Sequence, residues 1–190
     1  MKKVILTALI SSVISVSAFA APANQGHGKV KFKGEIVDAP CSISADSIDQ
    51  TVDLGQIANS VLAKGGASSP KPFTIELEDC VFDSGTKAPN NKVKITFSGA
   101  SAKFDPTLLG VTGLVLEGSA ADAKDNVGIQ ITDTNGMPIE MGKSTTQDHQ
   151  LQNGSNTLEY SAYVRGANVD VAKIPLGKFE GVTNFTLTYN

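Results

Sequence analysis

Charged and uncharged residues alternate without interruption over residues 29–36, which read Lys-Val-Lys-Phe-Lys-Gly-Glu-Ile. Because a β-strand points successive side chains to opposite faces, the two sets lie on opposite sides of the chain. The face without charge is made by Val30, Phe32, Gly34 and Ile36. We therefore predict a half-buried strand at about residues 29–38. No close hairpin partner precedes it, which raises the question of which sheet it completes.

The end of the chain carries the same period-two pattern. One face of this segment consists of Thr183, Phe185, Leu187 and Tyr189. We predict a last strand at about residues 179–189, ending flush with the C-terminus, with nothing downstream to pair with it. A sandwich of immunoglobulin type built this way would lack its seventh strand. It would expose an apolar groove and a strand edge, which a strand from another molecule could cover.

The composition between the two ends is that of an all-β domain. The chain has 18 glycines, abundant Val, Ile and Thr, and little helical periodicity. Segment 58–69 is expected to hold a short helix or an irregular connection, and segment 99–124 to be loop with short strands. Short strands at this spacing favour an immunoglobulin-type β-sandwich. The further candidate strands lie at about residues 41–45, 51–54, 72–79, 92–98, 126–133, 137–141 and 157–165.

Two Asn-Gly dipeptides mark expected turns. Asn135-Gly136 separates the candidate strands 126–133 and 137–141. It predicts a two-residue hairpin of type I′, which requires positive φ at both central residues. Asn153-Gly154 is a second signal of this kind and precedes the candidate strand at 157–165.

The first 20 residues have the organisation of a secretory signal peptide. Two lysines precede an apolar run over residues 4–16, and residues 18–20 (Ala-Phe-Ala) fit the small-residue cleavage rule. A membrane anchor is the alternative, but the apolar run is too short to span a bilayer comfortably. We expect an exported protein in three parts: a signal peptide at 1–20, an N-terminal extension at 21–38 and a folded domain at 39–190.

Cys41 and Cys80 are the two cysteines of the chain. In an exported protein the default expectation is one disulfide. Closing a loop of about 40 residues would stabilise the fold by roughly 4 kcal/mol in the loop-entropy model. The alternatives are two free thiols or half of a metal site, although no cluster of histidine and cysteine accompanies the pair.

The charged and histidine residues argue against several functions. Without the two lysines of the signal peptide, 14 basic residues stand against 19 acidic ones, a net charge of −5, and Arg165 is the only arginine. Because phosphate recognition relies on clustered cations, we expect no nucleic-acid partner. His27 and His149 are the only histidines, and we expect both to be solvated loop residues. Two imidazoles cannot supply the metal cluster of a copper/zinc dismutase.

No other catalytic constellation is visible either. The chain has no Gly-x-Ser-x-Gly elbow and no nucleophile placed beside a base, so we expect no enzyme, no cofactor and no metal site. Carbohydrate binding is an alternative function for an exported β-sandwich protein. Sugar sites favour exposed aromatic platforms, and the chain has no Trp and only three tyrosines, all in strand-like runs.

Taken together, these features resemble the pilus subunits of the chaperone–usher pathway, and most of all the major rod subunits of P-type and MR/P-type pili. Phe185 and Leu187 match the alternating apolar positions of the family's C-terminal motif. The other matching elements are the run 28–43 leading into the first cysteine, Gly55 after residues 52–54, Cys80, the run 153–162, Gly177 fourteenth from the C-terminus, and the penultimate Tyr189.

The resemblance implies a fold and a mechanism. The fold is an all-β, incomplete immunoglobulin-like sandwich that lacks its last strand and is completed by donor-strand exchange. A periplasmic chaperone lends a strand to the groove, and at the outer-membrane usher the extension of the next identical subunit replaces it. Segment 21–38 would be this donor strand and segment 39–190 the pilin domain. The protein would reach the cell surface as part of a fimbrium that supports adhesion, joined to adaptor and tip subunits.

The resemblance also implies roles for individual residues. Gly34 is the position where the family requires a residue without a side chain, because the facing pocket is shallow. One alternative is that residues 29–36 pair within their own chain as an ordinary first strand. For the whole protein, the alternative is a minor or adaptor fimbrial subunit or a carbohydrate-binding adhesin. The implied donor residues are Val30, Phe32, Gly34 and Ile36; the implied chaperone contacts at the groove edge are Gly177, Phe185, Leu187 and Tyr189.

Overall fold

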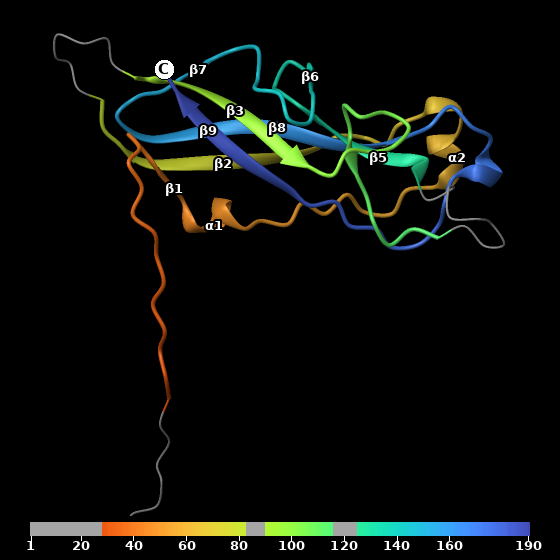
Figure 1. Cartoon of the computed structure of the whole chain (residues 1–190), viewed down its shortest axis with the longest axis horizontal. Coiled ribbons are helices and arrows are strands. Elements are labelled where there is room, and N and C mark those ends of the chain that lie inside the picture. Colours follow the sequence, from red (N-terminus) through yellow and green to blue (C-terminus); the bar gives the residue numbers. More distant parts are fainter. Residues whose placement is uncertain (1–27, 83–89, 116–124) are drawn as a thin grey trace, which may run out of the picture. The chain divides into compact units, whose positions relative to one another are not determined.

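The structure is a computed structural model that describes residues 28–82, 90–115 and 125–190 (Figure 1). The predicted signal peptide at 1–20 and His27 lie outside the described residues. The chain divides into two units, Met1–Val37 and Asp38–Asn190. The second unit holds all the described strands and helices.

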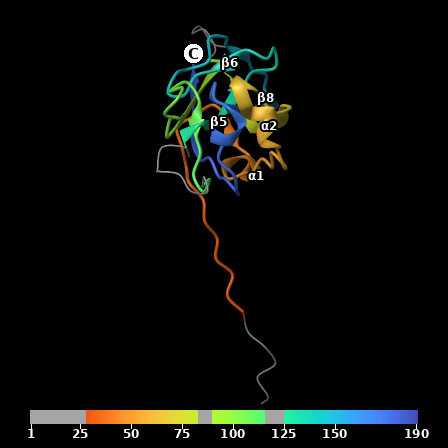
Figure 2. The ribbon, with the colours of Figure 1, turned by 90° about the vertical axis from the view of Figure 1, so that its right-hand side faces the viewer.

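Two antiparallel sheets make up this second unit, the domain (Figures 1 and 2). All described ladders are antiparallel. The larger sheet has the order β1 (Ser42–Ile43), β2 (Lys71–Cys80), β8 (Gly154–Gly166), β5 (Val127–Thr132) and β4 (Leu109–Gly110), with β6 (Pro138–Ile139) paired to β5. The smaller sheet has the order β7 (His149–Gln150), β3 (Lys92–Gly99) and β9 (Thr183–Tyr189). Helical turns are short: α1 (Ala45–Ile48), α2 (Asn59–Leu62), η1 (Ala63–Gly65) and η3 (Val171–Lys173).

The predicted all-β sandwich is confirmed, with corrections to several of its elements. The expected strand at 137–141 is reduced to β6. The expected strand at 41–45 is reduced to β1, because α1 begins at Ala45. The expected strand at 51–54 is wrong: these residues belong to no sheet. The last strand begins at Thr183 rather than at 179. The expected helix in segment 58–69 is present as α2 and η1.

Both Asn-Gly turns differ from the predicted hairpins. Gly136 has a φ of 77°, whereas Asn135 has no positive φ, so the turn is not of type I′. Asp133 instead pairs with Met137 across three loop residues (N–O 3.1 Å), and its Oδ1 accepts the Met137 N–H at 2.9 Å. Asn153-Gly154 joins no hairpin, because β7 and β8 lie in different sheets. The Asn153 Oδ1 accepts the N–H of Phe82 at 2.8 Å.

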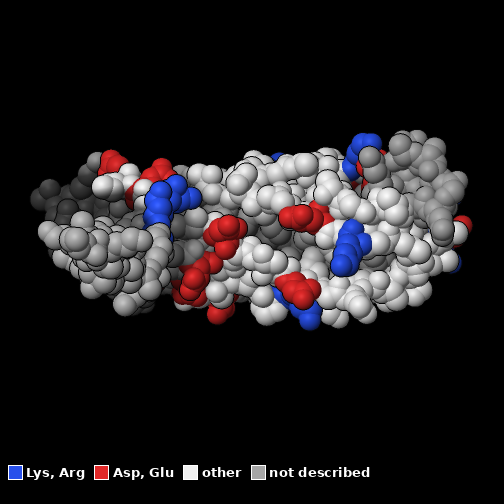
Figure 3. All heavy atoms as spheres, turned by 90° about the horizontal axis from the view of Figure 1, so that it is seen from below, with Lys and Arg blue, Asp and Glu red and all other residues white. Residues whose placement is uncertain are grey.

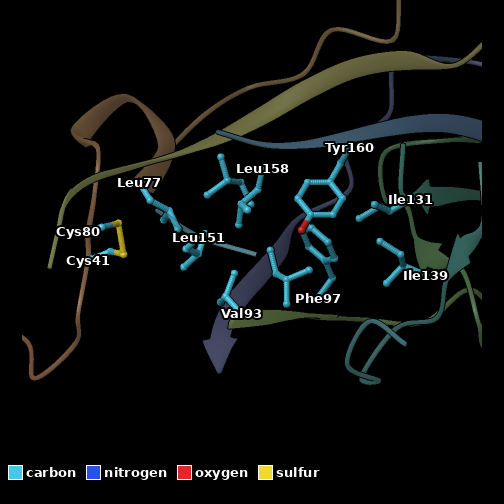
Figure 4. Packing of buried hydrophobic residues seen from close by; sticks show 12 residues of the cluster. Cys41, Leu77, Cys80, Val93, Phe97, Ile131, Ile139, Leu151, Leu158 and Tyr160 are labelled. Carbon is cyan, nitrogen blue, oxygen red and sulfur yellow. A yellow bond between two sulfur atoms is a disulfide. The ribbon is translucent and has the colours of Figure 1, made fainter. Parts of the chain in front are cut away.

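The core lies between the two sheets and follows from the alternation of apolar residues along each strand (Figure 4). Each fully buried large apolar side chain stabilises the fold by roughly 1.5–3 kcal/mol. The predicted disulfide is formed at one end of this core, joining Cys41 to Cys80 across a sequence separation of 39. Both cysteines are therefore bonded and neither can serve as a metal ligand. The buried residues of this core cluster include Ile75, Leu77, Val93, Ile95, Phe97, Leu158 and Tyr160.

Candidate functional site

An open groove of about 970 Å³ runs along the domain. Segment 49–57 forms one wall and segment 176–185 the other. Apolar side chains from both sheets line it between these walls: Phe73, Ile75, Phe97, Leu109, Val127, Ile129, Ile131, Ala162 and Val164. The groove therefore opens onto the interior of the sandwich. A strand placed between the two walls would cover this opening.

Strand β9 forms an edge of the smaller sheet beside this groove. Its residues alternate between half-buried and exposed along the whole strand, as the sequence predicted. Among the strands of residues 28–82, 90–115 and 125–190, β9 is paired on one side only, with β3. The half-buried set is Thr183, Phe185, Leu187 and Tyr189.

The hydrogen-bond pattern shows which backbone groups of β9 remain free. Lys92 and Asn190 exchange both backbone hydrogen bonds, at 3.2 and 3.0 Å. Such pairs alternate along an antiparallel ladder with pairs that share no hydrogen bond. By the β3–β9 register, the residues without hydrogen bonds to β3 are Thr183, Phe185, Leu187 and Tyr189. The same four residues thus turn their side chains inward and their N–H and C=O groups to the open edge.

The opposite wall, segment 49–57, is also unpaired. Val52, Leu54 and Ile57 are half-buried in it, and its residues form no backbone–backbone hydrogen bond within the described chain. The Gly55 N–H binds the Asp53 Oδ1 at 2.8 Å, which closes a local turn. Sequence reasoning missed this wall as part of the site. The sequence feature that marks this wall is the alternation of Val52 and Leu54, which by itself predicts an ordinary strand.

The N-terminal extension is extended at residues 28–37 and belongs to no sheet. Every residue in it is exposed, and Val30, Phe32 and Ile36 expose 75%, 91% and 101% of their side-chain surface. A Cβ added at Gly34 would meet no atom within 4 Å. The alternative that residues 29–36 pair within their own chain as a first strand is therefore not seen in the described residues.

The groove brings together only part of the residue set predicted at the C-terminal end. Gly177 and Phe185 line it. Leu187 and Tyr189 lie further along β9 and pack against the core near the disulfide, where burial raises the pKa of Tyr189. Gly177 has a φ of 120°, a conformation that favours glycine, which explains the residue type at this position.

His149 is not the solvated loop residue that the sequence predicted. It is half-buried on β7, and its Nε2 lies 3.2 Å from the Tyr160 hydroxyl on β8. Burial lowers the pKa of His149, opposed by the nearby carboxylate of Asp133. Burial also disfavours the charged form of Tyr160, which raises the pKa of this hydroxyl. The contact connects a strand of the smaller sheet to one of the larger sheet, so its role is structural.

Two kinds of site are absent from the part of the chain that the structure describes. No group of three or more His, Cys, Asp or Glu side chains is arranged to hold a metal ion there. Within the same residues, no helix is long and apolar enough to cross a membrane.

Comparison with known proteins extends these observations. A family model described as "Fimbrial protein" matches residues 30–190. The fimbria A protein of Serratia marcescens is 40% identical over 189 residues, covering 100% of this chain and 98% of that protein. The major MR/P fimbria protein of Proteus mirabilis is 39% identical over 180 residues, covering 94% of this chain and 91% of that protein.

Solved structures show the same similarity. The P pilus rod subunit PapA has a TM-score of 0.66 at 32% identity, covering 80% of this chain and 100% of that one. A subunit in the structure of a chaperone–usher pilus has a TM-score of 0.69 at 34% identity, covering 87% of this chain and 97% of that one. The open groove and the free edge of β9 thus occur on a fold shared with subunits that assemble into rods.

Proposed function

This chain belongs to the fimbrial protein family, and we propose that it is the rod-forming structural subunit of a chaperone–usher fimbria on the cell surface. Its partners are other pilin subunits. In this function the protein acts by assembly rather than by catalysis, and the fimbria it builds supports adhesion of the bacterium.

The observation that carries the proposal is an apolar groove with unpaired backbone on both walls. The fold is an immunoglobulin-like sandwich that lacks its last strand. An exposed edge beside an apolar groove favours pairing with another chain. A strand inserted between β9 and segment 49–57 would pair with both walls and cover the half-buried side chains of β9.

The donor in this proposal is the extension of a neighbouring subunit. Its apolar residues Val30, Phe32 and Ile36 would enter the groove, and Gly34 would face a point too shallow for a side chain. Burial of the three large side chains stabilises the joint by roughly 1.5–3 kcal/mol each. Each backbone hydrogen bond adds about 0.5–1.5 kcal/mol. The gross sum exceeds about 10 kcal/mol before ordering costs are subtracted, which favours slow dissociation of the joint.

The steps before assembly follow from the same groove. Segment 1–20 would direct export, segment 21–38 would supply the donor strand, and segment 39–190 would be the pilin domain. We propose that a periplasmic chaperone fills the groove of the free subunit and holds its C-terminal carboxylate. The chaperone would bind along the edge formed by Gly177 and the half-buried residues of β9. An outer-membrane usher would exchange that chaperone strand for the next subunit's extension. Adaptor and tip subunits would complete the fimbria.

Deletion of residues 21–35 tests the donor role directly. The shortened chain is expected to stay soluble only with a chaperone and to form no polymer, because it keeps the groove but loses the strand that fills the next one. Polymer formation by this deletion variant would overturn the proposal. Electron microscopy of cells with and without the gene tests the position in the fimbria. Loss of all filaments is expected of the rod subunit, whereas shortened or tipless filaments would identify a minor or adaptor subunit.

A further inference from the structure

One wall of the groove carries carboxylates without a counter-charge. Asp49 and Asp53 line the groove and are exposed. Segment 45–57 contains Asp46 as a third acidic residue and no Lys or Arg. Within the described residues, none of the three carboxylates belongs to an ion pair, since the four pairs present involve other residues. Figure 3 views the domain from the side of α1 and this segment, and both Asp or Glu and Lys or Arg side chains are visible on that face.

The other wall carries one charge of each sign, Lys178 and Glu180, on the segment before β9, and the outward residues of β9 itself are neutral. The exposed residues of β9 that alternate with its half-buried set are Asn184, Thr186 and Thr188. A strand lying between the two walls therefore has two carboxylates and no cation beside it on segment 49–57, whereas the charges of Lys178 and Glu180 on the other flank balance each other. Any charge on the outward face of that strand would interact chiefly with segment 49–57.

The extension carries the complementary charge. Lys29, Lys31 and Lys33 are exposed, and no ion pair joins them to any other residue in the described part of the chain. They alternate with the apolar residues that the proposed function places in the groove. When that apolar face turns inward, the three lysines have to turn outward, because successive side chains of a strand point to opposite faces.

The spacing of the two charge rows also matches. Lys29 and Lys33 are four residues apart, as are Asp49 and Asp53. A strand rises about 3.3 Å per residue, so the lysine pair of a paired extension spans roughly 13 Å, and the two aspartates are separated by the same number of residues. In segment 49–57 the half-buried Val52 and Leu54 lie on the inward side, which leaves Asp49 and Asp53 on the outward side with the lysines.

We propose that Asp49 and Asp53 form an acidic docking strip that receives the lysine face of the extension from a second copy of this chain. This inference rests on the proposed function, because it needs the second copy's residues 29–36 in the groove. Exposed ion pairs contribute little to affinity, but complementary charge accelerates encounter and selects the orientation of binding. The strip therefore raises the rate of subunit joining and favours partners whose donor strands are basic on this face.

The test compares assembly rates of the purified mature chain, followed by loss of monomer in size-exclusion chromatography at 20 and 500 mM NaCl. The acceptor variant D49K/D53K reverses the strip, and K29D/K33D reverses the donor. The quadruple variant exchanges both charges. The control E78K/E159K makes the same change in net charge on exposed residues of β2 and β8, which are not part of the groove.

At low salt, D49K/D53K is expected to assemble about tenfold more slowly than the unmodified chain, because steering effects on association are of this order. At 500 mM NaCl the difference should fall below about twofold, because exposed charges are then screened over a few ångströms. The quadruple variant should recover most of the rate, and the control should assemble normally. If D49K/D53K does not fold, as judged by circular dichroism, D49N/D53N replaces it with the same expected direction.

The docking-strip proposal is wrong if the control E78K/E159K slows assembly as much as D49K/D53K does. It is also wrong if the quadruple variant assembles no faster than D49K/D53K alone. An assembly rate of the unmodified chain that does not depend on salt would overturn it as well. These outcomes differ from failure of the proposed function, in which the unmodified chain forms no polymer or the 21–35 deletion polymerises at the same rate.

Discussion

Phe185 on β9 lies directly opposite Phe97 on β3, yet Phe97 is 2% exposed and Phe185 is only half-buried. The two residues share a position of the ladder without mutual hydrogen bonds, so the backbone of Phe185 points to the open edge. One strand beside β9 would both bury this ring and pair this backbone. The groove and the free edge are therefore two aspects of one missing strand.

Replacing Gly34 with Asn is expected to abolish polymer formation while leaving the domain folded. The extension is exposed in the free chain, so the substitution should not destabilise the domain there. In the joint, a side chain would have to enter a pocket sized for glycine. Glu35→Asn, on the outward face of the same segment, is the matched control and should polymerise. Gel electrophoresis without boiling would measure the polymers, and normal polymer from Gly34→Asn would place this residue outside the groove.

Leu187→Pro tests the hydrogen-bonding edge of β9. The N–H of Leu187 is directed away from β3, so proline at this position should leave the β3–β9 ladder intact. It would remove one hydrogen bond to an incoming strand, worth about 0.5–1.5 kcal/mol. Leu187→Ala is the control for the lost side chain. Polymers of Leu187→Pro should melt below those of Leu187→Ala, and equal melting temperatures would contradict a role of this N–H in the joint.

Sequence reasoning succeeded where a pattern depends on one strand alone. The alternation of Phe185 and Leu187 predicted both the strand and its half-buried face, because the side-chain period of a strand is set by local geometry. The disulfide followed from the presence of two cysteines in an exported chain. The expectation of an open strand edge agrees with β9, which within the described residues is paired on one side with β3.

Prediction from the sequence failed where strand pairing or a tertiary contact determines the local structure. Val52 and Leu54 have the alternation of a strand, but their segment has no partner strand in the described part of this chain. The turn at Gly136 is set by hydrogen bonds that the Asp133 Oδ1 accepts from the N–H groups of Asn135 and Met137, which a dipeptide pattern does not report. His149 is held by Tyr160 from the opposite sheet, and neighbouring polar residues gave no sign of that contact.

Removing the disulfide should lower the free energy of unfolding substantially. The bond closes a loop with a sequence separation of 39, for which the loop-entropy model gives about 4 kcal/mol. Replacing Cys41 and Cys80 together with Ala would test this by urea denaturation under chaperone-free conditions. Chemical reduction of the unmodified chain is the companion measurement and should give a similar loss. A loss below about 1 kcal/mol in both would show that other contacts hold this end of the core.

His149 should make the stability of the domain depend on pH. Burial lowers the pKa of His149 in the folded state, so between the folded value and the unfolded value near 6.5 the unfolded chain binds more protons. The stabilisation is therefore complete above about pH 6.5 and is lost as the pH falls below it toward the folded pKa.

His149→Gln keeps a polar partner for the Tyr160 hydroxyl but cannot titrate in this range. Urea denaturation of both proteins at pH 7.5 and 5.0 measures the effect. The unmodified chain should lose more stability on acidification than His149→Gln, because the carboxylates common to both proteins cancel in the difference. The Asp133 carboxylate opposes the effect of burial and the ring is only half-buried, so the difference in stability should be small. Equal losses would mean that protonation of His149 does not disturb its contact with Tyr160.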